Sequence, residues 1–253
     1  MEATEKDQEI IQTQLEILRF LSESTDDYLF SWSFQSDRIY FPSPIWKRYA
    51  LMEPGQTVCT VEDWYKAVYE KDLPMLQAEF ERLRRGEIKK HNMEYRLVDR
   101  EGNRVWISCR GQCQMDKSGH PLRMIGRISD TALAGEVDAL TGAFTSARLQ
   151  KDIKRILDRG TPGFLLLLGI DNLKNINIRH GRDYGNHTLQ TVADTLEKCV
   201  STGLRIYRVN GDCFAINLPT PDLQDVEAFY EQVRERLKVH CTVSAGAVAY
   251  HNH

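Results

Sequence analysis

The sequence predicts two mixed domains behind an N-terminal helix. The first is an α+β domain with a five-stranded antiparallel sheet, and the second is an α/β domain around a mostly antiparallel sheet. Residues before 131 contain two strand-like runs, then helix-like runs, then a three-strand meander. Residues after 138 alternate between helical and strand-like segments. The length of 253 residues also suits one or two domains of roughly 150 residues each.

The composition is that of a soluble globular protein, with 42% hydrophobic and 27% charged residues. Lys and Arg total 33 against 36 for Asp and Glu, which gives a net charge of -3. This balance is not basic enough to indicate nucleic-acid binding. No apolar run approaches the ~20 residues of a membrane span. The acidic N-terminus is unlike a signal peptide, and the six cysteines lack paired spacing. We therefore expect a cytoplasmic protein that binds neither membrane nor nucleic acid.

Residues 8–22 are predicted to form a helix because apolar residues recur at three- and four-residue spacing. The repeat consists of Ile10, Ile11, Leu15, Ile17, Leu18 and Leu21. Two interpretations remain open: a helix packed on the following domain, or a short dimer-forming coiled coil.

Residues 28–129 are predicted to form a two-strand hairpin, then helices, and then a three-strand meander. The predicted strands are 28–34, 38–41, 92–98, 104–115 and 122–129, and the predicted helices are 45–51, 61–69 and 73–83. Val105, Ile107 and Cys109 alternate with polar neighbours, which indicates a half-exposed antiparallel strand.

Several motifs in this segment resemble a PAS sensor domain. They are Trp64 with the downstream acidic residues, Glu94-Tyr-Arg-Leu, Arg104-Val-Trp106-Ile and Gly126-Arg-Ile-Ser-Asp130. The resemblance covers about residues 26–131, leaving residues 1–25 as the N-terminal helix and 132–137 as a linker. The PAS ligand stays unknown. No flavin-type Asn-Cys-Arg-Phe motif is present, and neither His91 nor His120 falls on a predicted pocket helix.

The second half predicts helices at 146–159, 183–200 and 223–239 and strands at 164–170, 204–209, 213–218 and 242–250. Asp171 directly follows the buried strand, where a carboxylate either binds an ion or caps the next helix. Asp212 lies in a hairpin turn, where an aspartate serves turn geometry or, with a second carboxylate, binds Mg²⁺.

Four motifs here resemble the GGDEF, or diguanylate cyclase, family. They are Asp138-Ala-Leu140-Thr141-Gly142, Asp171-Asn-Leu173-Lys174-Asn-Ile-Asn177, Asn210-Gly211-Asp212-Cys213-Phe214 and Val243-Ser244-Ala-Gly246. The resemblance implies a nucleotide-cyclase-like α/β sandwich over residues 138–253. The family condenses two GTP molecules into cyclic di-GMP as a dimer, with Mg²⁺ stabilising the charge.

The sequence departs from this family at the metal site. The signature reads Asn210, Gly211, Asp212, Cys213, Phe214, so that a thiol replaces the acid of active members. Gly169 occupies the place of a metal-binding aspartate, which leaves Asp212 as the remaining acidic metal position. Because Mg²⁺ prefers hard oxygen ligands, these changes predict impaired catalysis. Asn210 replaces a glycine, and asparagine is the least costly substitute where a positive φ is needed, so the change is compatible with the hairpin.

The positions expected to read guanine are mixed in their agreement with the family. The resemblance assigns Asp171, Leu173, Lys174, Asn177 and Asn186 to nucleotide binding, with Asn186 in place of an aspartate that reads guanine. An asparagine carbonyl accepts more weakly than a carboxylate. Residual binding of GTP with Mg²⁺ therefore remains an expectation.

The combined expectation is a bacterial signalling protein of the cyclic di-GMP type. In the leading hypothesis its GGDEF domain is catalytically impaired and serves as a regulatory, GTP-binding or dimer-forming module. The alternative is an active diguanylate cyclase. The resemblance also implies a homodimer and a downstream phosphodiesterase (EAL) domain or partner. The chain stops soon after the last predicted strand, so we expect the GGDEF domain to lack its C-terminal end.

Overall fold

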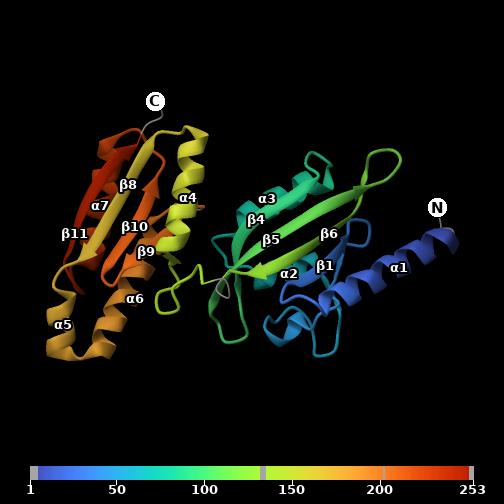
Figure 1. The fold of residues 1–253 in the computed structure, drawn as a ribbon, viewed down its shortest axis with the longest axis horizontal. Coiled ribbons are helices and arrows are strands. Elements are labelled where there is room, and N and C mark those ends of the chain that lie inside the picture. Colours follow the sequence, from blue (N-terminus) through green and yellow to red (C-terminus); the bar gives the residue numbers. More distant parts are fainter. Residues whose placement is uncertain (1–4, 132–134, 202, 251–253) are drawn as a thin grey trace. The chain divides into compact units, whose positions relative to one another are not determined.

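A computed structural model describes residues 5–131, 135–201 and 203–250 (Figure 1). The chain divides into two compact units, Met1–Thr131 and Ala132–His253, and each is described by itself. Within the described residues, no helix combines the length and the apolar character needed to cross a membrane.

The first unit contains one antiparallel sheet in the order β3-β2-β1-β6-β5-β4 (Figure 1). Its strands are β1 (Tyr28–Ser33), β2 (Arg38–Tyr40), β3 (Val58–Thr60), β4 (Lys90–Val98), β5 (Arg104–Met115) and β6 (Pro121–Asp130). Its helices are α1 (Glu5–Ser22), α2 (Val61–Ala67) and α3 (Leu73–Arg84). All five predicted strands are present, so the predicted α+β class is confirmed. The sixth strand, β3, has three residues and is too short to give a periodic signal.

Local side-chain chemistry begins and ends these elements. α2 begins with a capping box, in which Thr60 Oγ1 accepts from the Asp63 amide at 3.1 Å and Asp63 accepts from the Thr60 amide. The β4–β5 turn is closed by Asp99, whose carboxylate accepts from the Asn103 amide at 2.8 Å. Gly102 at this turn has a φ of +83°, a conformation that favours glycine.

The helix predicted at 45–51 is wrong beyond its first turn. A 3-10 turn spans Ile45–Lys47, and the chain then continues without regular helix. Ile45, Tyr49 and Leu51 are all buried in the core of the first unit. Packing of these three side chains therefore determines the backbone path more strongly than local helix propensity does.

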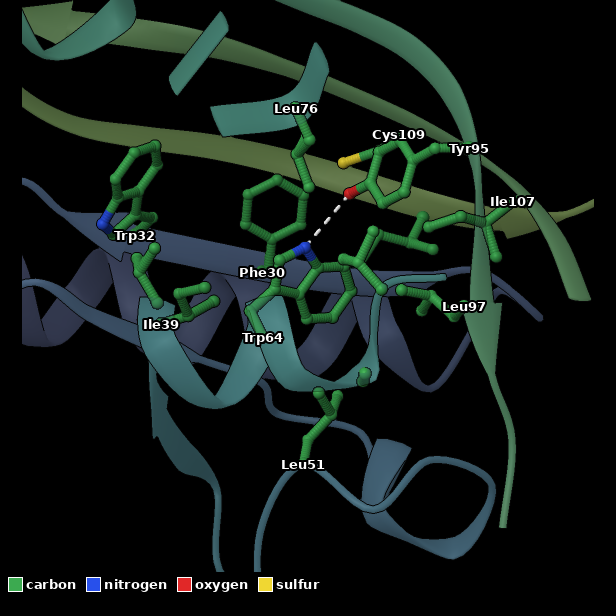
Figure 2. Close-up of a cluster of buried hydrophobic side chains, with 14 of the residues drawn as sticks. Phe30, Trp32, Ile39, Leu51, Trp64, Leu76, Tyr95, Leu97, Ile107 and Cys109 are labelled. Atoms are coloured by element: carbon green, nitrogen blue, oxygen red, sulfur yellow. Dashed lines mark hydrogen bonds between the residues drawn. The ribbon is translucent and has the colours of Figure 1, made fainter. Parts of the chain in front are cut away.

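The core of the first unit lies between the sheet and the helices α2 and α3. Figure 2 shows Trp64, Tyr95 and Cys109 meeting in this core, with the Trp64 indole donating to the Tyr95 hydroxyl at 3.2 Å. A second buried interaction fixes α3 to β4. Asp72 accepts two hydrogen bonds from the Arg96 guanidinium, at 2.6 and 2.8 Å, and a third from its amide at 2.8 Å.

The N-terminal helix shows features of both open interpretations. Leu18 is buried in the first unit, and α1 contacts β1. Ile17, Phe20 and Leu21 are 54%, 76% and 48% exposed. One side of α1 thus packs on its own domain, and another side presents apolar surface.

The second unit is a five-stranded sheet in the order β11-β8-β10-β9-β7. Its strands are β7 (Phe144–Thr145), β8 (Gly163–Ile170), β9 (Ile206–Asn210), β10 (Cys213–Leu218) and β11 (Val243–Tyr250). Its helices are α4 (Ser146–Arg159), α5 (Leu173–His180), α6 (Arg182–Cys199) and α7 (Leu223–Leu237). The β8, β9, β10 and β11 pairings are antiparallel, and β7 pairs with β9 in parallel. The predicted α/β class is confirmed.

Helices pack against this sheet through two different kinds of core. Apolar residues of α6 and α7 join those of β8 and β10 in one hydrophobic cluster. Beside α4 the interior is charged: buried Asp152 accepts from Arg148, Arg205 and Tyr207 at 3.0, 2.7 and 3.0 Å. Burial alone would raise the pKa of Asp152, but the two guanidinium groups outweigh it and the pKa is lowered.

Candidate functional site

Strand register brings together Gly169 and Cys213, the two positions at which the sequence departs from the metal ligands expected from the resemblance. Gly169, near the end of β8, is the direct cross-strand partner of Cys213, the first residue of β10. Ser244 of β11 is the partner of Gly169 on its other side. A Cβ added at Gly169 would have no atom within 4 Å, so this place on the sheet has open space beside it.

The signature hairpin is anchored to the first motif of the domain. The Arg208 guanidinium donates to Asp138 Oδ1 at 3.0 Å and to the Gly211 carbonyl at 2.7 Å. Asp138 also accepts from the Thr141 hydroxyl at 2.7 Å. Burial opposes ionisation of Asp138, but the bonds from Thr141 and Arg208 outweigh it and lower its pKa. Two motifs that lie 70 residues apart thus form one rigid support for the hairpin.

The hairpin at Asn210 is present, and it requires no positive φ at this residue. Among the described residues, the non-glycine positions with positive φ are Asp37 and Asn172, and Gly211 is not among the positive-φ glycines either. Asn210 ends β9 in regular strand conformation and faces solvent. The hairpin accommodates this residue through a register shift between Cys213 and Phe214 rather than through a left-handed residue.

Asp171 does not cap the following helix. The N-cap of α5 is Asn172, with a φ of +57° and no side-chain capping bond. The Asp171 carboxylate instead accepts from the Ser244 hydroxyl at 2.7 Å, which links the end of β8 to β11. The helix-cap interpretation of Asp171 is therefore excluded. The carboxylate lies at the end of β8, bonded to Ser244.

Asn177 and Asn186, which the resemblance assigns to nucleotide binding, lie on α5 and α6, and these two helices contact each other. The close approach occurs at Gly185, directly before Asn186. A Cβ at Gly185 would come within 1.7 Å of Asn177 Oδ1. Glycine at this position therefore creates the space that the Asn177 amide occupies.

The other predicted nucleotide and signature residues differ in accessibility. Lys174 and Asp212 are exposed, whereas Leu173 and Phe214 are 7% and 0% exposed within the core of the second unit. Any nucleotide contact of Leu173 must therefore come from its backbone. Partial burial and the neighbouring Asp212 raise the pKa of the Cys213 thiol, which favours the neutral form.

The described part of the chain contains no group of three or more His, Cys, Asp or Glu side chains arranged to hold a metal ion. Sequence reasoning missed the anchoring role of Arg208 and the spacing role of Gly185. Asp138 and Arg208 lie 70 positions apart, and no local pattern in the sequence connects them. Strand register and helix contact supply that connection.

Comparisons with known proteins agree with both halves of this description. Residues 41–128 match the PAS fold family, and residues 136–252 match the family described as diguanylate cyclase, GGDEF domain. Diguanylate cyclase VdcA of Vibrio cholerae is 27% identical over 101 residues, covering 40% of this chain and 30% of that protein. Diguanylate cyclase DgcM of Escherichia coli is 34% identical over 70 residues, covering 28% and 17%. The aligned segments thus span well under half of these relatives.

Two solved structures are similar to parts of this chain at low TM-scores. Diguanylate cyclase SiaD of Pseudomonas aeruginosa, solved with its activator SiaC, is 24% identical with a TM-score of 0.44, covering 48% of this chain and 54% of that one. The N-terminal domain of a diguanylate cyclase with PAS/PAC sensor from Marinobacter aquaeolei is 23% identical with a TM-score of 0.38, covering 44% and 99%. From the two family matches, this chain is a PAS domain followed by a GGDEF domain.

Proposed function

We propose that this chain is a sensor protein of cyclic di-GMP signalling whose GGDEF domain is catalytically impaired and has a regulatory role. The observation that supports this proposal most directly is the pairing of Gly169 with Cys213 across neighbouring strands. At the two places where paired carboxylates would meet, one residue has no side chain and the other has a thiol that favours its neutral form.

The residues at this place do not fit Mg²⁺. Hard divalent cations require several oxygen ligands, and a neutral thiol is a poor substitute for a carboxylate. The nearby carboxylate of Asp212 is exposed in the hairpin turn, and that of Asp171 is engaged by Ser244. One exposed carboxylate is too little to hold the ions on which condensation of two nucleoside triphosphates depends.

GTP binding without condensation is the second part of the proposal. Asn177 is seated against Gly185, and Asn186 follows it on α6. Both asparagines offer an amide that can hydrogen-bond a guanine edge. Lys174 is exposed and positively charged, which suits a phosphate chain. These features support retained nucleotide recognition at a site that lacks its metal ligands.

A homodimer is the third part of the proposal. The exposed apolar residues Ile17, Phe20 and Leu21 on α1 support self-association through this helix, because a second copy would bury them. A downstream EAL domain or protein partner remains the proposed output. The opposing candidate is an active diguanylate cyclase, and it is favoured by the names of the relatives VdcA and DgcM.

Two assays on the purified chain test the proposal. GTP with Mg²⁺ is expected to raise the melting temperature, because a ligand that binds the folded state stabilises it. At one hundred times its Kd, GTP would add about 2.7 kcal/mol. Incubation with GTP and Mg²⁺ is expected to yield no cyclic di-GMP. Robust turnover would establish the opposing candidate, and no stabilisation at millimolar GTP would leave a sensor and dimerisation protein without a nucleotide role.

A further inference from the structure

In the described part of the first unit, the interior leaves almost no room for a ligand, whereas the surface has a larger pocket. The cavity among the core side chains, lined by Trp64, Cys109 and Met124 among others, has a volume of about 10 Å³. That volume is on the order of one water molecule. The larger pocket, of about 380 Å³, is lined by the segment that joins β2 to β3, by Asp63 and by Arg100. Small-molecule sites have volumes of about 300–1,000 Å³, so this loop pocket is large enough for a ligand.

Arg100 is the cation of the loop pocket, and backbone carbonyl groups fix its position. It lies in the β4–β5 turn, where its amide donates to the Arg48 carbonyl at 2.9 Å. Its Nε donates to the Trp46 carbonyl at 2.7 Å, and its Nη2 donates to the Met52 carbonyl at 3.5 Å. Among the described residues, no carboxylate pairs with this guanidinium, and its Nη1 donates no hydrogen bond. A positioned guanidinium with free N–H groups is suited to bind a carboxylate.

Gln56 and Glu53 supply the other free polar groups of the loop pocket. Gln56 Oε1 accepts from the Glu53 amide at 3.2 Å, which fixes the orientation of the side-chain amide and leaves both Nε2 protons free. The Glu53 carboxylate is exposed and has no hydrogen bond or ion pair with any other described residue. The Asp63 carboxylate, by contrast, already accepts from Thr60 and Lys66. The pocket therefore offers one unpaired cation, one unpaired anion and an amide donor.

We propose that the loop pocket is a binding site for a free α-amino acid with an apolar side chain. The ligand carboxylate accepts from Arg100 and Gln56, and its ammonium group donates to Glu53. Its side chain packs against Met52 and Val58, which also line the pocket. A simple anion would leave the Glu53 carboxylate without a partner, and a simple cation would leave the guanidinium without one. A ligand that carries both charges pairs with both groups.

This inference gives a ligand to the sensor domain of the proposed function. All residues of the loop pocket belong to the first unit, whereas the positions assigned to GTP belong to the second. Binding of an amino acid is therefore measured without GTP, and the GTP assays are carried out without an amino acid. Failure of one proposal is thus distinguishable from failure of the other.

Isothermal titration calorimetry of the full chain with L-leucine and L-methionine tests the proposal. Two analogues of leucine keep its apolar group: isocaproate lacks the ammonium group, and isoamylamine lacks the carboxylate. We expect saturable binding of the amino acids and binding about 10-fold weaker for each analogue, the lower end for loss of a hydrogen bond to a charged group. The absence of saturable binding by both amino acids would overturn the proposal. Equal affinity for leucine and either analogue would overturn it as well.

Two variants place the binding at the loop pocket. Arg100→Gln and Glu53→Gln are each expected to weaken leucine binding about 10-fold, with circular dichroism verifying the fold. Glu53 is exposed, so Glu53→Gln carries the test where Arg100→Gln fails to fold. The matched control is Glu62→Gln, because the Glu62 side chain is 81% exposed and does not line the pocket; we expect unchanged binding. A folded Glu53→Gln variant that still binds leucine more tightly than isocaproate by the original factor would overturn the proposal.

Discussion

Restoring the two carboxylates is the sharpest perturbation of the proposed inactive site. The double variant Gly169→Asp/Cys213→Glu places acids on direct cross-strand partners, whose Cβ atoms lie about 4.5–5.5 Å apart in antiparallel pairs. Both side chains then reach a shared ion at about 2.0–2.1 Å from each oxygen. The aspartate introduced on β8 meets no packing obstacle, because a Cβ at Gly169 has no atom within 4 Å.

The expected magnitudes follow from this geometry. Without metal, two like charges directly opposite each other lower the free energy of unfolding by up to about 1 kcal/mol, and Mg²⁺ is expected to reverse that loss. A single preorganised electrostatic group typically contributes about 10²–10³ in rate, so two such groups contribute about 10⁴–10⁶ if they act additively. The double variant is therefore expected to gain cyclic di-GMP synthesis, and each single variant is expected to gain only about 10²–10³ in rate.

Chromatography of the products formed from GTP measures the rate of cyclic di-GMP synthesis. The shift in melting temperature between samples with and without Mg²⁺ measures metal binding. The control variant Gly169→Asn/Cys213→Gln has side chains of the same size without the charge. The reasoning is refuted if this control gains as much activity as the carboxylate pair. It is equally refuted if the double variant binds no Mg²⁺, since the open space and register would then not define a metal site.

Three further predictions concern the supports of the two domains. Asp72→Asn leaves the Arg96 guanidinium buried without its carboxylate and is expected to lower the free energy of unfolding of the PAS domain by about 3–5 kcal/mol, measured by urea denaturation. Gly185→Ala is expected to leave the free energy of unfolding unchanged or to lower it in the unmodified sequence. In an Asn177→Ala background the same change is expected to raise it by about 1 kcal/mol, because the added methyl then meets no amide. Equal effects in both backgrounds would contradict the close contact. The folded-state pKa of His91, about 9, lies above its usual 6.5, so the stability from its protonation is complete below pH 6.5 and is lost as the pH rises through 9. The stability difference between the unmodified chain and His91→Gln is expected to shrink by about 3 kcal/mol over that pH range, and a constant difference would contradict it.

Local patterns in the sequence were sufficient to predict most elements of both domains. The alternation around Cys109 predicted the strand that β5 forms, and the apolar run before Asp171 predicted β8. Both signals are strong because the side chains on one face of each strand are buried. Where long-range packing decides the backbone, the same reasoning fails. The predicted helix at 45–51 shows this, since it is reduced to a 3-10 turn at Ile45–Lys47 in a segment whose Ile45, Tyr49 and Leu51 side chains are buried.

The candidate sites depended even more on contacts between distant residues. Asp171 was expected either to cap a helix or to bind an ion, and the bond from Ser244, 73 positions away, removed the first option. The contact of His91 gave no sequence signal, because its partner Glu79 comes from a helix that lies 12 positions earlier in the chain. Residue types alone can therefore indicate where an expected metal ligand is missing. Strand register and packing are needed to identify the residues that lie beside that position.

The most direct test of the central claim is a turnover assay on the unmodified chain. Purified protein is incubated with GTP and Mg²⁺, and cyclic di-GMP is quantified by mass spectrometry, with Gly169→Asp/Cys213→Glu assayed in parallel. We expect no product from the unmodified chain beyond the level without protein, and we expect product from the double variant. Sustained synthesis by the unmodified chain, with Gly169 and Cys213 in place, would contradict the central claim.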